Sequence, residues 1–199
     1  MGVSMKKSII IIILSFMTVL IARELALGKV MPKVNVSLQD VSGGLFTLEK
    51  LMDKNGLLVI FSCNTCPWVI RWQDRYNPIA KLCLENDIGF VAVNSNNSQH
   101  DGVDSYKAMV EHAQEYNYQF PYVVDKKAEL AVAFGATKTP HVYLFNKHNK
   151  LVYRGAIDDN AKNADKVGES YLVNAVNAVA LGEEIKVKKT KALGCSIKF

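Results

Sequence analysis

The chain has 199 residues, of which 49% are apolar and 22% are charged, and its formal net charge is +5. This composition is that of an ordinary globular protein with a core of its own, which excludes a disordered chain and a small domain stabilised by disulfides. The charge is mild and no basic face is interleaved with aromatic residues, so we expect no nucleic-acid partner. The four cysteines therefore need another explanation.

The first predicted element is an export segment. Two lysines precede an uncharged, largely apolar run over residues 8–22. A basic start and an apolar stretch of about 7–15 residues are typical of a signal peptide, whereas a spanning helix needs roughly 20 apolar residues. We therefore predict a signal peptide over residues 1–28, cleaved after Gly28 or Ala22, in preference to an uncleaved anchor. The protein would then be periplasmic or otherwise extracytoplasmic, with membrane contact only through residues 8–22 if the segment is not cleaved.

Residues 29–182 are predicted to form one domain. A hairpin of two strands, 34–38 and 45–48, leads into a short helix over 49–53. The run LLVIFS over residues 57–62 is continuously apolar and has the length of a strand buried on both faces.

A helix is expected over residues 66–85, where apolar side chains recur every three or four positions, and Pro78 should kink or split it. The remaining predicted elements are strands over 89–93, 121–124, 141–145 and 151–154, and helices over 105–116, 127–134 and 170–181. Strands alternate with helices and a hairpin closes the sheet, which predicts a three-layer α/β fold. Residues 183–199 are predicted to be a basic, solvated C-terminal tail.

The motif Cys63-Asn-Thr-Cys66 lies where the buried strand ends and the helix begins. Free N–H groups at a helix start favour negative charge, and a cysteine there can fall from a pKa of about 8.5 to between 3.5 and 7.5. We predict that Cys63 attacks a substrate disulfide and that Cys66 resolves the mixed disulfide. Zinc binding is the weaker interpretation, because no second CxxC or paired histidines complete four ligands. No metal and no cofactor are expected.

A second segment carries a family resemblance. Gly135, followed by Pro140 and an apolar strand, resembles the cis-proline segment of the thioredoxin superfamily. The resemblance implies that the Thr139–Pro140 bond is cis, that its loop packs beside the CxxC motif, and that the backbone of Thr139 pairs with an extended substrate segment. Trp68, directly after Pro67, could line the same substrate surface, although packing in the core would equally account for it.

The long interval between Cys66 and Pro140 is similar to that of the AhpC/TSA or redoxin branch, which inserts an α/β unit there. The stretches FSCNTCPWV, AVNSN, FPYVVD, LVYRGAIDD and GCSIKF resemble exported bacterial proteins of this branch. The resemblance implies a thioredoxin fold with an N-terminal hairpin extension. It also implies a protein disulfide oxidoreductase whose partners are protein disulfides or dithiols and an upstream thiol partner.

Two departures from the family pattern keep alternatives open. The peroxidatic signature Pro-x-x-x-Thr/Ser-x-x-Cys is absent before both Cys63 and Cys66, which argues against a thiol peroxidase without removing it. A copper carrier that uses these cysteines and His141 is the other alternative. The buried strand also lacks the acidic residue that often manages the resolving thiol's proton, so the candidate acceptors are Glu49, Asp158 and Asp159.

The other two cysteines have different expected roles. Cys83 falls on the apolar stripe of its helix and is expected to be a buried structural thiol. Cys195 is a candidate third redox thiol, although bridging to another chain or simple burial would also account for it. His141 could tune the pKa of Cys63, but packing at the end of a strand is the preferred interpretation. The remaining histidines, His100, His112 and His148, are expected to be solvated.

Overall fold

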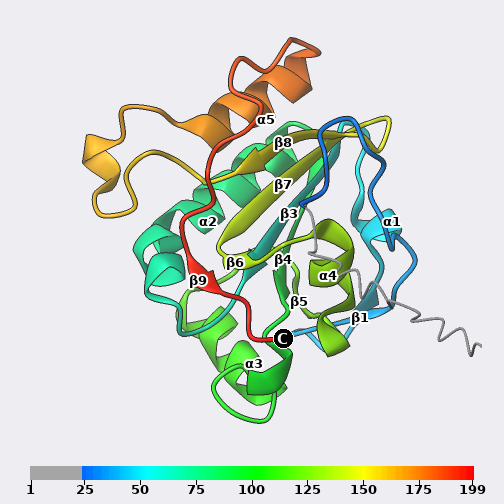
Figure 1. Cartoon of the computed structure of the whole chain (residues 1–199), viewed down its shortest axis with the longest axis vertical. Coiled ribbons are helices and arrows are strands. Elements are labelled where there is room, and N and C mark those ends of the chain that lie inside the picture. The colour runs from blue at the N-terminus through cyan, green and yellow to red at the C-terminus, as the bar shows by residue number, and fades with distance from the viewer. Residues whose placement is uncertain (1–23) are drawn as a thin grey trace, which may run out of the picture.

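The computed structural model describes residues 24–199. Residues 1–23 of the predicted export segment therefore lie outside the described residues, and only residues 24–28 of it are described. At its centre is a mixed seven-stranded sheet in the order β2-β1-β5-β4-β3-β7-β8, and a small second sheet pairs β6 with β9 (Figure 1). The strands are β1 (Leu38–Asp40), β2 (Leu45–Phe46), β3 (Gly56–Ser62), β4 (Ile88–Asn94), β5 (Tyr122–Val124), β6 (Lys138–Thr139), β7 (His141–Asn146), β8 (Leu151–Gly155) and β9 (Cys195–Ser196). The helices are α1 (Leu48–Leu51), α2 (Pro67–Glu85), α3 (Tyr106–Glu115), α4 (Glu129–Phe134) and α5 (Tyr171–Leu181).

The predicted three-layer α/β arrangement is confirmed. Buried side chains of α2, α3 and α5 pack with one face of the sheet, and those of α1 and α4 pack with the other. Every residue of β3 is buried, because this central strand has a helical layer on each side. The segment between α2 and Pro140 contains β4, α3, β5 and α4, in agreement with the predicted insertion.

The sheet brings two loops to one edge. β3 runs parallel to β4, with Ser62 opposite Asn94, so both strands end at the same side of the molecule. The CxxC motif follows β3 there and the asparagine-rich stretch from position 94 follows β4. β7 runs antiparallel to β3, with Phe61 opposite His141, and therefore begins at this same edge.

The predicted hairpin exists, but its strands are shorter and shifted. β1 begins at Leu38, where the prediction ended its first strand, and β2 stops at Phe46. The next helix begins at Leu48 because the Thr47 hydroxyl accepts a hydrogen bond from the backbone N–H of Lys50 at 3.2 Å.

The sequence predicted a kink or a split at Pro78, and the split does not occur, since helix α2 continues to Glu85 as one element. Proline removes the hydrogen bond that would reach the carbonyl of Asp74. Both residues lie on the exposed side of the helix, where water can serve that carbonyl. The missing bond is therefore tolerated.

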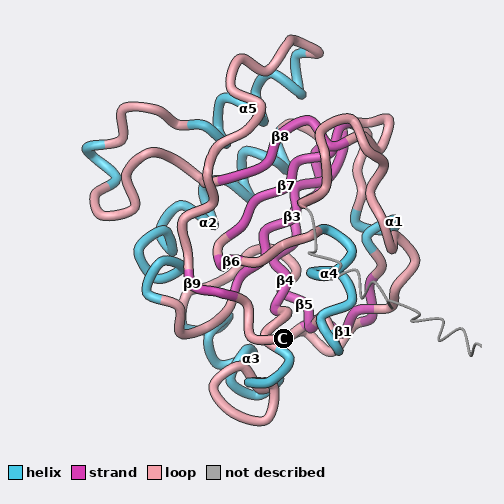
Figure 2. Tube along the Cα trace, viewed as in Figure 1, coloured by secondary structure: helices cyan, strands magenta, loops and turns pink. Residues whose placement is uncertain are grey.

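The predicted solvated tail is wrong for the backbone of this segment, although most of its lysine side chains are exposed. The backbone of Arg154 bonds to Lys188 and Thr190, and Ile185 and Ile197 are buried. The end of the chain then crosses the molecule to pair with β6, as the strand colouring of Figure 2 shows.

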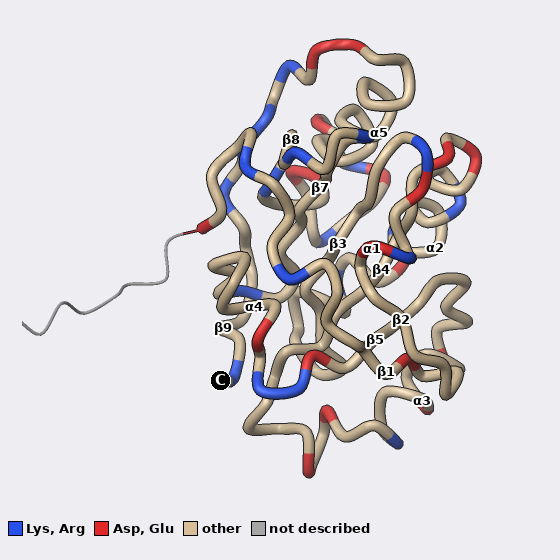
Figure 3. The backbone as a smooth tube through the Cα atoms, turned by 90° about the vertical axis from the view of Figure 1, so that its right-hand side faces the viewer, with Lys and Arg blue, Asp and Glu red and all other residues tan. Residues whose placement is uncertain are grey.

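Basic and acidic positions are interspersed along the chain in the view of Figure 3.

Residues 24–28, which the prediction assigned to the export segment, contact the domain. The backbone N–H of Leu25 donates to the carbonyl of Phe134 at 2.8 Å, and the Glu24 carboxylate pairs with the guanidinium of Arg154. Within the part of the chain described here, no helix has the length and apolar character needed to cross a membrane.

Candidate active site

The two cysteines of the motif lie at the junction between β3 and α2. Cys63 follows the last residue of β3, and Cys66 precedes Pro67, the first residue of α2, with extended backbone angles. Proline fits this first helical position because its missing N–H would have no helical partner there. Both cysteines are free thiols, and their exposed fractions are only 2% and 4%.

Both sulfurs contact Thr139, 76 and 73 residues further along the chain. Cys63 Sγ lies 3.3 Å from the Thr139 hydroxyl oxygen, and the Cys66 thiol donates to the Thr139 carbonyl oxygen at 3.0 Å. The Thr139–Pro140 bond is cis. The structure thus brings Thr139 and Pro140 beside the cysteine pair.

Hydrogen-bond donors surround the sulfur of Cys66. Its pKa is lowered to about 4, first because the Cys63 thiol donates to it and then because the Cys195 thiol and the N–H groups of Val69 and Cys195 do so. Burial opposes this effect. The amide at the helix start therefore serves Cys66, whereas the sequence analysis assigned that stabilisation to Cys63.

The pKa of Cys63 is raised. The first cause is the hydrogen bond that its thiol makes to Cys66, the second is burial, and the negative charge of Asp104 adds to them. The hydroxyl of Thr139 acts in the opposite direction. When the pair loses a proton, the negative charge is therefore favoured on Cys66 and the remaining proton on Cys63.

A carboxylate that the sequence analysis missed anchors the CxxC loop. Asp104, whose exposed fraction is 1%, accepts hydrogen bonds from the backbone N–H of Asn64 at 2.9 Å and from the side-chain amides of Asn94 and Asn96 at 2.9 and 2.8 Å. The side chain of Asn64 is held in turn by the Tyr122 hydroxyl, which donates to it at 2.9 Å. A signal was present in the sequence: the asparagine-rich stretch follows a buried strand.

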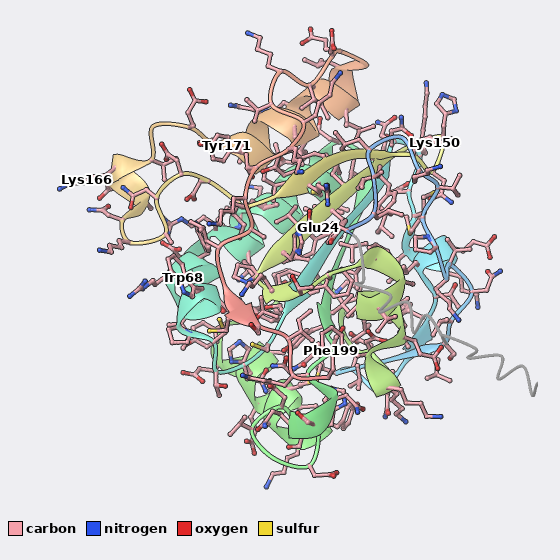
Figure 4. All side chains as sticks on the ribbon, viewed as in Figure 1. Glu24, Trp68, Lys150, Lys166, Tyr171 and Phe199 are labelled. Atoms are coloured by element: carbon pink, nitrogen blue, oxygen red, sulfur yellow. The ribbon has the colours of Figure 1, made fainter. Side chains whose placement is uncertain are left out.

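Trp68 lies in the first turn of α2 and is partly buried against the same core as the cysteines (Figure 4). Its backbone N–H donates to the sulfur of Cys195, and the Arg71 guanidinium lies 5.0 Å from the centre of its ring. Trp68 thus lies beside the cysteine pair and packs against the core, so its place at a substrate surface stays a prediction.

The three predicted proton acceptors are engaged elsewhere or exposed. Asp158 accepts from the Trp72 indole N–H at 2.6 Å and pairs with Arg75 at 3.3 Å. Asp159 is exposed and accepts from the backbone of Gly168, and Glu49 is exposed on α1. None of these carboxylates is among the leading causes of the pKa shift of either cysteine.

His141 packs on the face of the sheet opposite the cysteines, as preferred from the sequence. Its ring lies 3.4 Å from the Tyr143 hydroxyl and 3.9 Å from the Glu24 carboxylate. Burial, aided by the charge of Arg154, lowers its pKa to about 3, so the ring is neutral. Among the histidines expected to be solvated, His112 is instead buried, with its ring nitrogen 3.1 Å from the Tyr118 hydroxyl.

Cys83 and Cys195 differ in their surroundings. Cys83 is fully buried in the core, as predicted, and burial raises its pKa to about 12. Cys195 is half-buried in β9, beside Cys66. Among residues 24–199, no three cysteine, histidine or acidic side chains are grouped so that they could hold a metal ion.

Comparisons with known proteins agree with this geometry. The sequence model of the Redoxin family matches residues 26–169. An uncharacterized conserved protein from Geobacillus kaustophilus is 34% identical, with a TM-score of 0.81 over 87% of this chain and 92% of its own. A thioredoxin-like protein solved in its oxidised form has a TM-score of 0.63 at 23% identity, covering 80% of this chain and 100% of its own, which shows that the fold is thioredoxin-like.

A relative of named activity is the thiol-disulfide oxidoreductase ResA of Halalkalibacterium halodurans. It is 26% identical over 119 residues, which are 60% of this chain and 63% of the ResA chain. The match therefore spans less than two thirds of the ResA protein.

Proposed function

Because the chain belongs to the redoxin family, we propose that it is an extracytoplasmic thiol–disulfide oxidoreductase that exchanges the Cys63–Cys66 pair with disulfides of other proteins. The observation that carries the proposal is the contact of both sulfurs with Thr139, at the junction where β3 ends and α2 begins. The lowered pKa of Cys66 supports it. The similarity to ResA supports the same reaction type.

The hydrogen bond between Cys63 and Cys66 gives the first step a proton acceptor. Cys63 attacks one sulfur of a substrate disulfide, and its proton moves to Cys66, which already accepts the hydrogen bond. A bond forms between Cys63 and the substrate, the substrate disulfide breaks, and one substrate thiolate leaves. No carboxylate is needed at this point.

The second step returns that proton. The departing substrate thiolate takes the proton of Cys66, and the resulting Cys66 thiolate attacks the Cys63 sulfur of the mixed disulfide. The Cys63–Cys66 disulfide forms and the second substrate thiolate leaves, taking a proton from water. The substrate has gained two electrons and the protein has lost two. An upstream dithiol partner would restore the reduced pair.

Substrate would meet the surface formed by Trp68, Thr139 and Pro140. In the structure the backbone of Thr139 pairs with Cys195 of the same chain. A substrate strand can pair with Thr139 only after β9 has moved. We therefore place recognition at this edge in the form of the protein in which β9 is displaced.

Insulin-disulfide reduction by the full chain, with dithiothreitol as electron donor, tests the proposal. Cys63→Ser should abolish the catalysed rate, and Cys66→Ser should accumulate a mixed disulfide that is visible on a non-reducing gel. Cys83→Ala is the matched control, because Cys83 lies in the core and takes no part in the exchange. Full activity of Cys63→Ser would refute the proposal. Peroxide consumption far above that of a free thiol, or Cu(I) binding tighter than that of a generic dithiol, would favour the peroxidase or the copper carrier.

A further inference from the structure

The end of the chain forms a strand on the active-site loop. β9 pairs antiparallel with β6, placing Cys195 opposite Thr139 and Ser196 opposite Lys138. The backbone N–H of Ile197 donates to Thr137 at 3.0 Å. Cys195 is thereby held at a fixed position beside the cysteine pair.

Two further contacts fix the end of the strand. The backbone N–H of Lys198 donates to the Asn96 side chain at 2.9 Å, and the N–H of Ser98 donates to the carbonyl of Lys198 at 3.0 Å. Asn96 also donates to Asp104, the carboxylate that anchors the CxxC loop. The terminal strand and the CxxC loop therefore share one set of supports.

Gly194 explains how β9 comes so close. A β-carbon at this position would lie 2.2 Å from the carbonyl oxygen of Thr139 and 2.7 Å from its carbonyl carbon. Both atoms belong to the backbone of the loop before Pro140, so they cannot turn aside as a side chain would. Only glycine permits this approach, and the residue after it is the cysteine that meets Cys66.

Three thiols meet at this edge. Cys195 packs against the core cluster that contains Cys63 and Cys66, and its thiol helps to lower the pKa of Cys66. Cys195 is half-buried, whereas the other two are almost fully buried. The sulfur of Cys66 therefore has a cysteine on each side, and the one from β9 is the most accessible of the three.

We propose that Cys195 is a third redox-active thiol, which takes over the disulfide of the Cys63–Cys66 pair by bonding to Cys66. The inference rests on the proposed function, in that the oxidised pair is its starting point. The β6–β9 pairing carries it, because it sets Cys195 opposite Thr139, the residue that both Cys63 and Cys66 contact. Cys195 also packs against the core cluster that contains both cysteines.

The step is an internal exchange and needs no further oxidant. The Cys195 sulfur attacks the Cys66 sulfur of the Cys63–Cys66 disulfide, a Cys66–Cys195 bond forms, and the Cys63–Cys66 bond breaks. Cys63 leaves as a thiolate and receives the proton that Cys195 gives up. No electrons enter or leave the protein. The oxidised form that results keeps β9 bonded over Thr139 and exposes the half-buried Cys195 sulfur to an incoming dithiol reductant.

Disulfide mapping tests the exchange. The full-length reduced protein is treated with one equivalent of oxidised glutathione, quenched in acid, alkylated and digested, and the linked peptides are identified by mass spectrometry. We expect Cys66–Cys195 peptides together with Cys63–Cys66 peptides from the wild type. In Cys63→Ser, Cys66–Cys195 should be the main product.

Gly194→Ala is the matched variant, because it keeps all four cysteines but its β-carbon would push β9 away from Thr139. It should retain Cys63–Cys66 and lose most of the Cys66–Cys195 product. If Gly194→Ala folds poorly, Cys195→Ser replaces it as the control, because this variant cannot form the Cys66–Cys195 bond and should yield only Cys63–Cys66 peptides. If only Cys63–Cys66 peptides are recovered from the wild type, the proposed exchange is refuted, even if Cys63→Ser forms the Cys66–Cys195 bond. Mapping does not depend on substrate turnover, so loss of insulin reduction would refute the proposed function separately.

Discussion

Asp104 accepts a hydrogen bond from the backbone N–H of Asn64, one of the two residues between Cys63 and Cys66, at 2.9 Å. The same carboxylate accepts from Asn94 and Asn96, which follow the neighbouring strand. The loop that carries the two thiols is thus held by a buried negative charge from a distant loop. That charge also raises the pKa of Cys63.

Asp104→Asn should therefore have two effects. In asparagine one of the two carboxylate oxygens is replaced by an NH₂ group, which cannot accept a hydrogen bond from the N–H groups that Asp104 faces. The loss should lower the unfolding free energy by about 1–3 kcal/mol. Loss of the negative charge should lower the pKa of Cys63, since Asp104 raises it. Urea unfolding and thiolate absorbance at 240 nm measure these effects, with the exposed Asp101→Asn as the control. Equal stability of the two variants would contradict the anchoring role.

The contact between Cys195 and Cys66 predicts a shift in thiol ionisation. The Cys195 thiol donates to the Cys66 sulfur and helps to lower its pKa to about 4. Cys195→Ala removes this donor and should raise the pKa of Cys66, whereas Cys195→Ser retains a hydroxyl donor and should restore part of the effect. The 240 nm titration of the reduced proteins measures both. Identical titrations for the alanine and serine variants would show that the donor has no influence.

The neutral His141 predicts a loss of stability in acid. Its pKa is about 3 in the folded protein, against 6.5 when unperturbed, because it is buried. Between these values the unfolded chain binds a proton that the folded chain does not, so the unfolding free energy falls as the pH falls from 6.5 towards 3. The slope from this group approaches about 1.4 kcal/mol per pH unit.

Urea unfolding at pH 7, 5.5 and 4.5 measures this effect. His141→Leu should show a shallower decline than the wild type, while His148→Leu, at an exposed turn, should follow the wild type. Parallel declines for all three proteins would mean that His141 does not set the acid response.

The pairing of Glu24 with Arg154 bears on signal cleavage. Cleavage after Gly28 would remove Glu24 and leave the buried Arg154 guanidinium without its carboxylate, whereas cleavage after Ala22 retains it. We therefore predict that the mature protein begins at Arg23. The intact mass of the protein recovered from the extracytoplasmic fraction measures this, and a mass that corresponds to a start at Lys29 would refute it.

The same ion pair predicts a stability difference. Glu24→Gln should lower the unfolding free energy by about 1 kcal/mol, a value kept small because Glu24 is partly exposed. Glu49→Gln, at an exposed position of α1, is the control. Equal thermal unfolding of the two variants would show that the pair does not hold the N-terminal segment to the domain.

The sequence predicted the parts of the fold that depend on local pattern. The run over residues 57–62 and the apolar stripe after Cys66 placed the thiols correctly between β3 and α2. The approach of Thr139 followed from family resemblance, since no local rule brings together residues more than 70 positions apart.

What could not be predicted is held together by contacts between distant, short segments. β6 and β9 have two residues each, too few for any periodicity to show. The lysines of the terminal segment suggested solvation because their side chains do face water, while the backbone between them bonds to Arg154. Asp104 lay in a polar loop, where burial cannot be read from residue type.

The position of β9 has a practical consequence for anyone who handles this protein. Phe199 is only four positions beyond Cys195, and its neighbour Lys198 is tied to Asn96. A purification tag or fluorescent fusion attached after Phe199 would begin close to the thiols and could displace β9 from β6. Affinity handles are better inserted at the exposed turn around Lys147 and His148, which lies at the other end of the sheet from the motif.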